Sequence, residues 1–142
     1  MQPKKLLTIA FDIDGVIGQY HGFQGEDQLG LPNMEVVNAI RLLDARGHTI
    51  IIHSTHETEL IRTYCLAHNI PFRYINENGE RKGGNSGKPI ANVYVDDRAY
   101  RYQGQSTAEL VHDLEEFQPH WKNCPASAKG QCTCINKNTT SV

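Results

Sequence analysis

A short apolar segment that ends in two acidic residues constrains this chain more than any other feature. The run from Leu6 to Phe11 is mostly apolar, and Asp12, Asp14 and Gly15 follow it directly. Such a run is typical of a central strand in a parallel sheet with helices on either side. Because side chains on extended backbone repeat every two residues, both carboxylates should share one face at the strand's end. This pair favours a bound divalent cation or a shared proton, whereas a plain Asp-Gly turn is the alternative.

Later segments place further reactive side chains near the ends of apolar runs. The run 50–52 leads into two hydroxyl residues, and the run 93–95 leads into an acidic pair, with a lysine ahead of it. The side chains concerned are Ser54, Thr55, Lys88, Asp96 and Asp97. A nucleophilic carboxylate, a hydroxyl, a lysine and an acidic pair in this order are what phosphoryl transfer through an aspartyl intermediate requires.

In these motifs the chain resembles the haloacid dehalogenase superfamily of phosphohydrolases, over about residues 5–117. The first superfamily motif, hhhhDxDG, matches residues 11–15 in full, and the fourth, an acidic pair after a strand, matches Asp96 and Asp97. The second motif matches Ser54. The third is a single lysine, best matched by Lys88, with Lys82 as the alternative.

The resemblance implies an enzyme, a phosphatase that hydrolyses phosphomonoesters with one Mg²⁺ per active site through an aspartyl phosphate. Asp12 would be the nucleophile. Asp14 would be the general acid and base, and its backbone carbonyl would also bind the metal. Asp12 and Asp97 would supply the metal's carboxylate ligands. Asp96 could instead be the direct ligand, or could order metal-bound water.

The same resemblance assigns the phosphate contacts. Ser54, with Thr55 as the alternative hydroxyl, and Lys88 would bind the phosphoryl oxygens. His53 is expected to pack or to face solvent, because the mechanism has no vacant proton-transfer role for it. His56 stands where relatives often place a polar residue beside the substrate, so it could help to select the leaving group.

The alternation of strand and helix patterns predicts an α/β fold, a Rossmann-like open parallel sheet of four to five strands with helices on both faces. The expected strands cover 6–11, 49–53, 72–75 and 93–95, with 100–103 as a candidate fifth. The expected helices follow Asn33, cover 57–68, and start at the capping box Ser106–Glu109, with Leu110, Val111, Leu114 and Phe117 on one apolar face. Residues 18–32 leave room for a flap, and no cap domain is expected.

The length of 142 residues favours one phosphatase core, over residues 1–118, followed by a polar tail over 119–142. The tail holds His120, Cys124, Cys132 and Cys134, which could bind a structural Zn²⁺. Their spacing does not match a standard finger or ribbon, and a disordered tail with spare thiols is the alternative.

Charge and hydropathy limit the kinds of partner that we expect for this protein. A net charge of -2 and a pI of 6.4 give no general attraction to nucleic acid or membranes. No apolar segment approaches the roughly 20 residues of a membrane span, so we expect a cytoplasmic protein.

The expected substrate is a small phosphoester such as a sugar phosphate or nucleotide. The alternatives are a polynucleotide-end phosphatase, supported by the cations in residues 81–88, and a non-catalytic phosphate-binding or regulatory module. A homo-oligomer, in which a partner subunit would help to enclose the site, is a further alternative.

Overall fold

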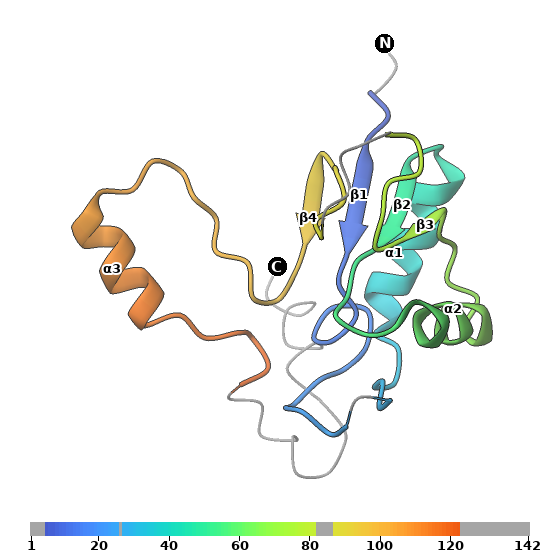
Figure 1. Cartoon of the computed structure of the whole chain (residues 1–142), viewed down its shortest axis with the longest axis horizontal. Helices are drawn as coiled ribbons and strands as arrows, with labels where there is room; N and C mark the ends of the chain where they lie inside the picture. The colour runs from blue at the N-terminus through green and yellow to red at the C-terminus, as the bar shows by residue number, and fades with distance from the viewer. Residues whose placement is uncertain (1–4, 26, 82–86, 123–142) are drawn as a thin grey trace.

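Four parallel strands form one open sheet in the computed structural model, which describes residues 5–25, 27–81 and 87–122. The elements in chain order are β1 (Thr8–Phe11), α1 (Met34–Ala45), β2 (Thr49–Ile52), α2 (Thr58–Ala67), β3 (Tyr74–Ile75), β4 (Val93–Val95) and α3 (Thr107–Glu115). The strand order is β3-β2-β1-β4 (Figure 1). The predicted α/β class with an open parallel sheet is therefore confirmed. No cap domain is present in the described parts of the chain.

The strand β1 lies in the middle of the sheet, and its carboxyl end marks the functional edge. Phe11 is in register with Ile52 of β2 and with Val95 of β4. The backbone N–H of Asp12 donates to the carbonyl of Val95 over 2.9 Å, and that of His53 donates to Phe11 over 2.8 Å. Because all strands are parallel, the segments that follow β1, β2 and β4 leave the sheet at the same edge.

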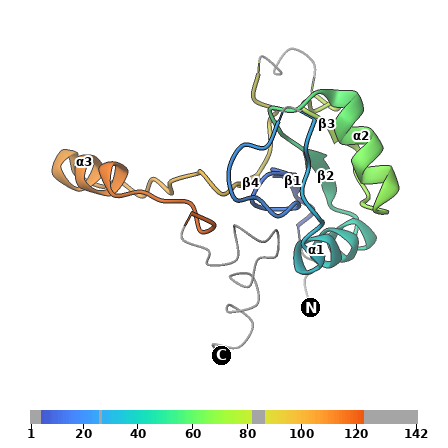
Figure 2. The same ribbon diagram turned by 90° about the horizontal axis from the view of Figure 1, so that it is seen from below.

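One face of the sheet forms the hydrophobic core with α1 and α2. This core includes the side chains of Ile9, Phe11, Ile50, Ile52, Val37, Ile40, Ile61, Tyr64 and Cys65. Both helices lie on the same side of the sheet (Figure 2). Burying one such isoleucine stabilises the fold by roughly 1.5–3 kcal/mol, so this layer holds the sheet and its functional edge in place.

The opposite face carries the buried side chains of Ala10 and Ile51. Part of the described loop between β3 and β4 is buried as well. In that loop Pro89 is fully buried, and its carbonyl accepts a hydrogen bond from the Tyr94 hydroxyl over 2.6 Å. The sequence predicted helices on both faces. In the described residues, α1 and α2 pack on one face, and α3 stands apart from the sheet.

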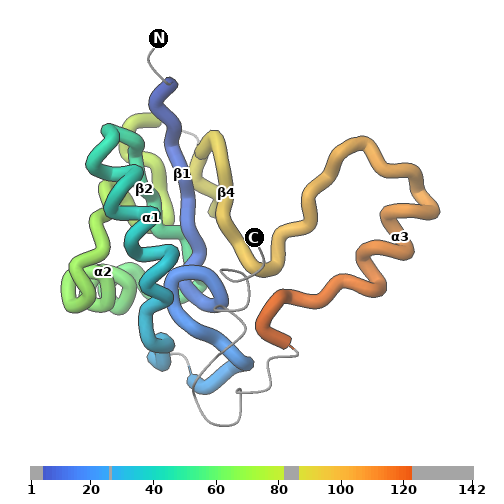
Figure 3. Tube along the Cα trace, turned by 180° about the vertical axis from the view of Figure 1, so that it is seen from behind, coloured from blue at the N-terminus to red at the C-terminus, as the bar shows by residue number. Residues whose placement is uncertain are grey.

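The helix α3 forms where the capping box predicts it, but it does not join the core. The Ser106 hydroxyl accepts the N–H of Glu109 over 3.2 Å, as a capping box requires. None of the α3 residues is buried, and Val111 and Leu114 are 51% and 54% exposed. The helix stands apart from the sheet at the end of an extended segment (Figures 1 and 3). Its predicted apolar face therefore stays partly exposed, at Val111 and Leu114.

The candidate fifth strand over 100–103 is not formed; the described residues of this segment have no strand pairing. Their polar groups bond instead to residues that follow the segment. The Tyr100 hydroxyl donates to Asp113 Oδ2 over 2.5 Å, and the Gln103 N–H donates to Gln105 Oε1 over 2.6 Å. These local bonds take the place of a strand ladder and tie the extended segment to α3. None of the described helices is both long and apolar enough to span a membrane.

Candidate active site

An open cavity of about 1020 Å³ lies beyond the carboxyl ends of β1, β2 and β4. The residues that line it include Asp12, Asp14, Tyr20, His53, Ser54, Thr55, His56, Asp96, Asp97 and Arg98. All the site residues predicted from the sequence are therefore brought to one cavity, except Lys88. Ligands of open parallel sheets bind in this position, because the strand ends and their loops form a crevice there.

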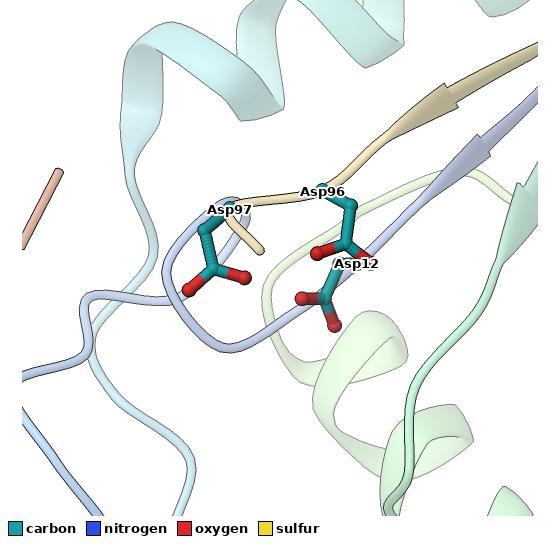
Figure 4. A group of neighbouring side chains, drawn as sticks. All are labelled: Asp12, Asp96 and Asp97. Carbon is teal, nitrogen blue, oxygen red and sulfur yellow. The ribbon is translucent and has the colours of Figure 1, made fainter. Parts of the chain in front are cut away.

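Three of the carboxylates that line this cavity lie close together. Asp12 follows β1, and Asp96 and Asp97 follow β4, so the pairing of these strands sets the three side chains next to one another (Figure 4). A carboxylate oxygen from each lies within 4.8 Å of the others. Asp96 is exposed, and its Oδ1 accepts the backbone N–H of Arg98 over 2.8 Å.

This crowding changes the protonation of Asp12. The pKa of Asp12 is raised from its ordinary value of 3.8 to about 8, and burial is the largest cause. A hydrogen bond between the protonated Asp12 and Asp97 also contributes to the rise, as do the negative charges of Asp96 and Asp97. The hydrogen bond from the Ile13 N–H to Asp12 Oδ1 lowers this pKa. Without a cation, the Asp12 carboxyl therefore holds a proton near neutral pH. A divalent cation would offset the same repulsion and leave the carboxylate ionised.

The cluster fits the divalent cation that the family resemblance implies. Asp97 Oδ1 is buried and has no hydrogen-bond partner among the described residues. A buried carboxylate oxygen without a donor is costly unless a cation or proton binds it. Mg²⁺ needs few carboxylates, because it keeps several of its waters. Asp12 and Asp97 can supply these ligands, with the exposed Asp96 beside them.

Asp14 forms a close pair with a histidine. His56 Nε2 lies 2.7 Å from Asp14 Oδ2, and the two side chains are 9% and 25% exposed. The other oxygen, Asp14 Oδ1, is buried without a hydrogen-bond partner in the described chain. The sequence placed His56 beside the substrate but missed this contact. The sequence does contain an indication of the contact between Asp14 and His56, because both residues follow strand ends that meet at one edge of the sheet.

The two candidate hydroxyls lie at the end of β2. The backbone N–H of Ser54 donates to Asn76 Oδ1 over 2.8 Å, and the Ser54 Oγ accepts the N–H of His56 over 3.3 Å. Thr55 is exposed, and His53, expected to pack or to face solvent, is half-buried and lines the cavity. Both hydroxyls therefore remain available to a bound phosphate.

Lys88 does not line the cavity that holds the acidic cluster. Its Nζ lies 4.6 Å from the centroid of the Tyr94 ring, and the cavity is lined by the neighbouring Gly87 instead. Because a lysine side chain is long and flexible, it could turn toward a bound phosphate, and its role stays a prediction. The alternative Lys82, with most of the basic stretch that supported polynucleotide binding, lies outside the described residues.

The described residues of the glycine-rich stretch 18–32 form an irregular segment that lines the site where a flap is predicted, and this segment is called the flap below. The Tyr64 hydroxyl of α2 donates to the carbonyl of Gly30 over 2.7 Å and ties the flap to the core. Between the flap, Asp14 and His56 lies a second cavity of about 530 Å³. This cavity adjoins the acidic cluster through Asp14, so it is placed to receive the group attached to a bound phosphate.

A segment beyond α3 also reaches the site, which the sequence did not predict. His120 and Trp121 were assigned to a tail, yet they contact Gly15 and Asp97. The domain boundary that the sequence predicted after residue 118 therefore lies next to residues that contact the site. The proposed zinc ligands Cys124, Cys132 and Cys134 lie outside the described residues, and His120 is engaged with the carbonyl of Gly15.

Comparison with known proteins supports the fold. No family model and no curated protein matches the chain. Among solved structures, a conserved protein from Bacteroides thetaiotaomicron is similar, with a TM-score of 0.56 and 25% identity over 79% of this chain and 91% of that chain. That protein is described as conserved and without a stated activity. The chain therefore shares its architecture with a solved protein of similar extent, and its chemistry has to be argued from the site.

Proposed function

We propose that this protein is a Mg²⁺-dependent phosphomonoester hydrolase that acts through an aspartyl phosphate on Asp12. The observation that carries the proposal is the cluster of Asp12, Asp96 and Asp97 at the carboxyl end of the central strand, within an open cavity. The order of the four sequence motifs supports the same reaction. A non-catalytic relative would not need the Asp12 and Asp14 pair, and both residues are present.

Asp12 and Asp14 divide the chemistry between them. A carboxylate oxygen of Asp12 forms a bond to phosphorus while the bond from phosphorus to the leaving oxygen breaks, and Asp14 gives that oxygen its proton. Asp14 then takes a proton from water, whose oxygen attacks phosphorus and releases Asp12. A bound cation, held by Asp12 and Asp97, would screen the repulsion between the nucleophile and the phosphate. His56 holds Asp14 from one side, which fixes the direction of its proton transfer.

The remaining residues bind and orient the substrate. The Ser54 hydroxyl would donate to a phosphoryl oxygen, with Thr55 next to it, and Lys88 would turn to neutralise the same group. The leaving group would occupy the flap cavity, which adjoins Asp14. We expect a small phosphoester, such as a sugar phosphate or a nucleotide, because the flap lines a half-open cavity of about 530 Å³.

The direct test is hydrolysis of p-nitrophenyl phosphate by metal-free protein with and without added Mg²⁺. Wild-type turnover should require the metal, and Asp12→Asn should lower the rate by at least about 10³-fold, because it removes the nucleophile. Asp44→Asn, which changes an exposed carboxylate on α1, is the matched control and should keep full activity. Turnover that survives Asp12→Asn would refute the proposal. No turnover by wild-type protein on this ester, sugar phosphates or nucleotides would favour the phosphate-binding module.

A further inference from the structure

The chain returns to the active site after α3. The segment 119–122 turns tightly, with the N–H of Lys122 donating to the carbonyl of Pro119 over 3.1 Å. In this turn His120 Nε2 lies 2.6 Å from the carbonyl oxygen of Gly15, in the loop that follows Asp14. The next residue, Trp121, is 8% exposed and donates from Nε1 to Asp97 Oδ2 over 2.5 Å. The turn thus contacts both acidic segments of the site.

The indole ring of Trp121 is held from several sides. The Tyr20 ring of the flap meets it edge-on, with centroids 4.7 Å apart and planes at 83°. The Arg98 guanidinium carbon lies 5.3 Å from the ring centroid. A Cβ atom added at Gly15 would lie 2.9 Å from Trp121 Cδ1, so the Gly15 backbone lies directly against the indole ring. These contacts fix the direction in which the indole N–H points.

The indole hydrogen bond determines how Asp97 meets the cluster. It occupies Oδ2, while Oδ1 is buried and has no partner among the described residues. Because the two oxygens of a carboxylate move together, fixing one also fixes the direction of the other. An indole is also a suitable donor for this task, since it has no charge and accepts no hydrogen bond. An arginine or lysine in its place would compete with a cation for the carboxylate.

We infer that Trp121 is a positioning residue for the divalent-cation site: its N–H holds Asp97 Oδ2 so that Asp97 Oδ1 is presented to the metal. The inference rests on the metal site of the proposed function. It also selects between the two acidic residues that follow β4. Asp97 becomes the direct ligand, and the exposed Asp96, whose Oδ1 accepts the Arg98 N–H, becomes the secondary partner.

The chain provides its own probe, because Trp121 is its single tryptophan. Metal-free full-length protein is titrated with Mg²⁺ and with Mn²⁺, following tryptophan fluorescence and, separately, heat by calorimetry. In the wild type the emission should change saturably, with the same midpoint as the heat. Asp97→Asn should abolish both signals, whereas Asp96→Asn should retain them with a midpoint shifted by less than about 10-fold.

Trp121→Phe keeps an aromatic ring but loses the N–H, so its Mn²⁺ affinity by calorimetry should fall about 10–100-fold. Its hydrolysis rate should recover at saturating Mg²⁺, which general damage to the site would not allow. If this variant does not fold, the wild-type titration with the two aspartate variants still decides the question.

The failures are distinguishable. Wild-type protein that binds neither cation would overturn the metal site and the proposed function with it. Cation binding without a fluorescence change, or with unchanged affinity in Trp121→Phe, would overturn the role of Trp121 alone.

Discussion

Replacing the proposed nucleophile should stabilise the metal-free protein while it removes activity. In the folded chain the pKa of Asp12 is raised to about 8 by burial and by its acidic neighbours, from an ordinary value of 3.8. Between these two values the folded state keeps a proton that the unfolded chain has lost. The stabilisation contributed by the protonated Asp12 carboxyl is therefore fully present below pH 4. It falls as the pH rises toward 8 and stays constant above that pH. Asp12→Asn cannot ionise, so it avoids this loss.

The size of the effect follows from the same shift. One pKa unit corresponds to about 1.4 kcal/mol, and complete expression of the shift would give several times that value. Because water reaches this partly exposed cluster, we expect Asp12→Asn to gain roughly 1–3 kcal/mol over wild type at pH 8. At pH 4 the two proteins should differ by less than about 0.5 kcal/mol.

The assay is urea unfolding of both proteins at pH 4, 6 and 8 in the presence of a chelator. Asp44→Asn, on the exposed surface of α1, should follow wild type within about 0.5 kcal/mol at every pH. Added Mg²⁺ should stabilise the wild type and reduce the advantage of Asp12→Asn. A difference between wild type and Asp12→Asn that is the same at all three pH values would refute the argument from crowded carboxylates.

Two further predictions address the core and the closure of the site. Ile40→Ala, in the fully buried layer under the sheet, should cost about 2–5 kcal/mol of unfolding free energy, while Leu114→Ala on the exposed face of α3 should cost less than about 1 kcal/mol. Equal losses in urea titrations would show that α3 packs on the core. Gly15→Ala places a Cβ against Asp97 and Trp121 at a φ of +83°, so it should lower stability by about 1–3 kcal/mol and weaken Mn²⁺ binding in calorimetry. Unchanged binding would show that this close approach does not shape the site.

The fold and most of the site residues follow from sequence pattern because they depend on regular elements. Apolar runs mark β1, β2 and β4, and parallel connections bring their carboxyl ends to one edge. The spacing of Asp12 and Asp14 and the pair Asp96 and Asp97 then place the carboxylates together without further information. The helix starts are equally local, since the side chain of Asn33 accepts the Glu35 N–H at the start of α1.

What the sequence missed depends on irregular or long-range contacts. The amphipathic pattern of α3 predicts a helix with an apolar face, but it does not say whether that face packs on the sheet, and no α3 residue is buried in the structure. Trp121 reaches Asp97 across an irregular segment that carries no periodic signal. Lys88 illustrates a different limit, because several rotatable bonds decide whether its ammonium meets the Tyr94 ring or the cavity.

The most direct test of the central claim is to trap the phosphorylated protein. The full-length chain with Mg²⁺ would be mixed with a phosphorus-labelled phosphomonoester that it hydrolyses, quenched in acid during turnover, and mapped by peptide mass spectrometry. The account predicts a phosphoryl group on the peptide that contains Asp12, and none on Asp12→Asn. Steady hydrolysis with no label on Asp12, or label that persists in Asp12→Asn, would contradict it.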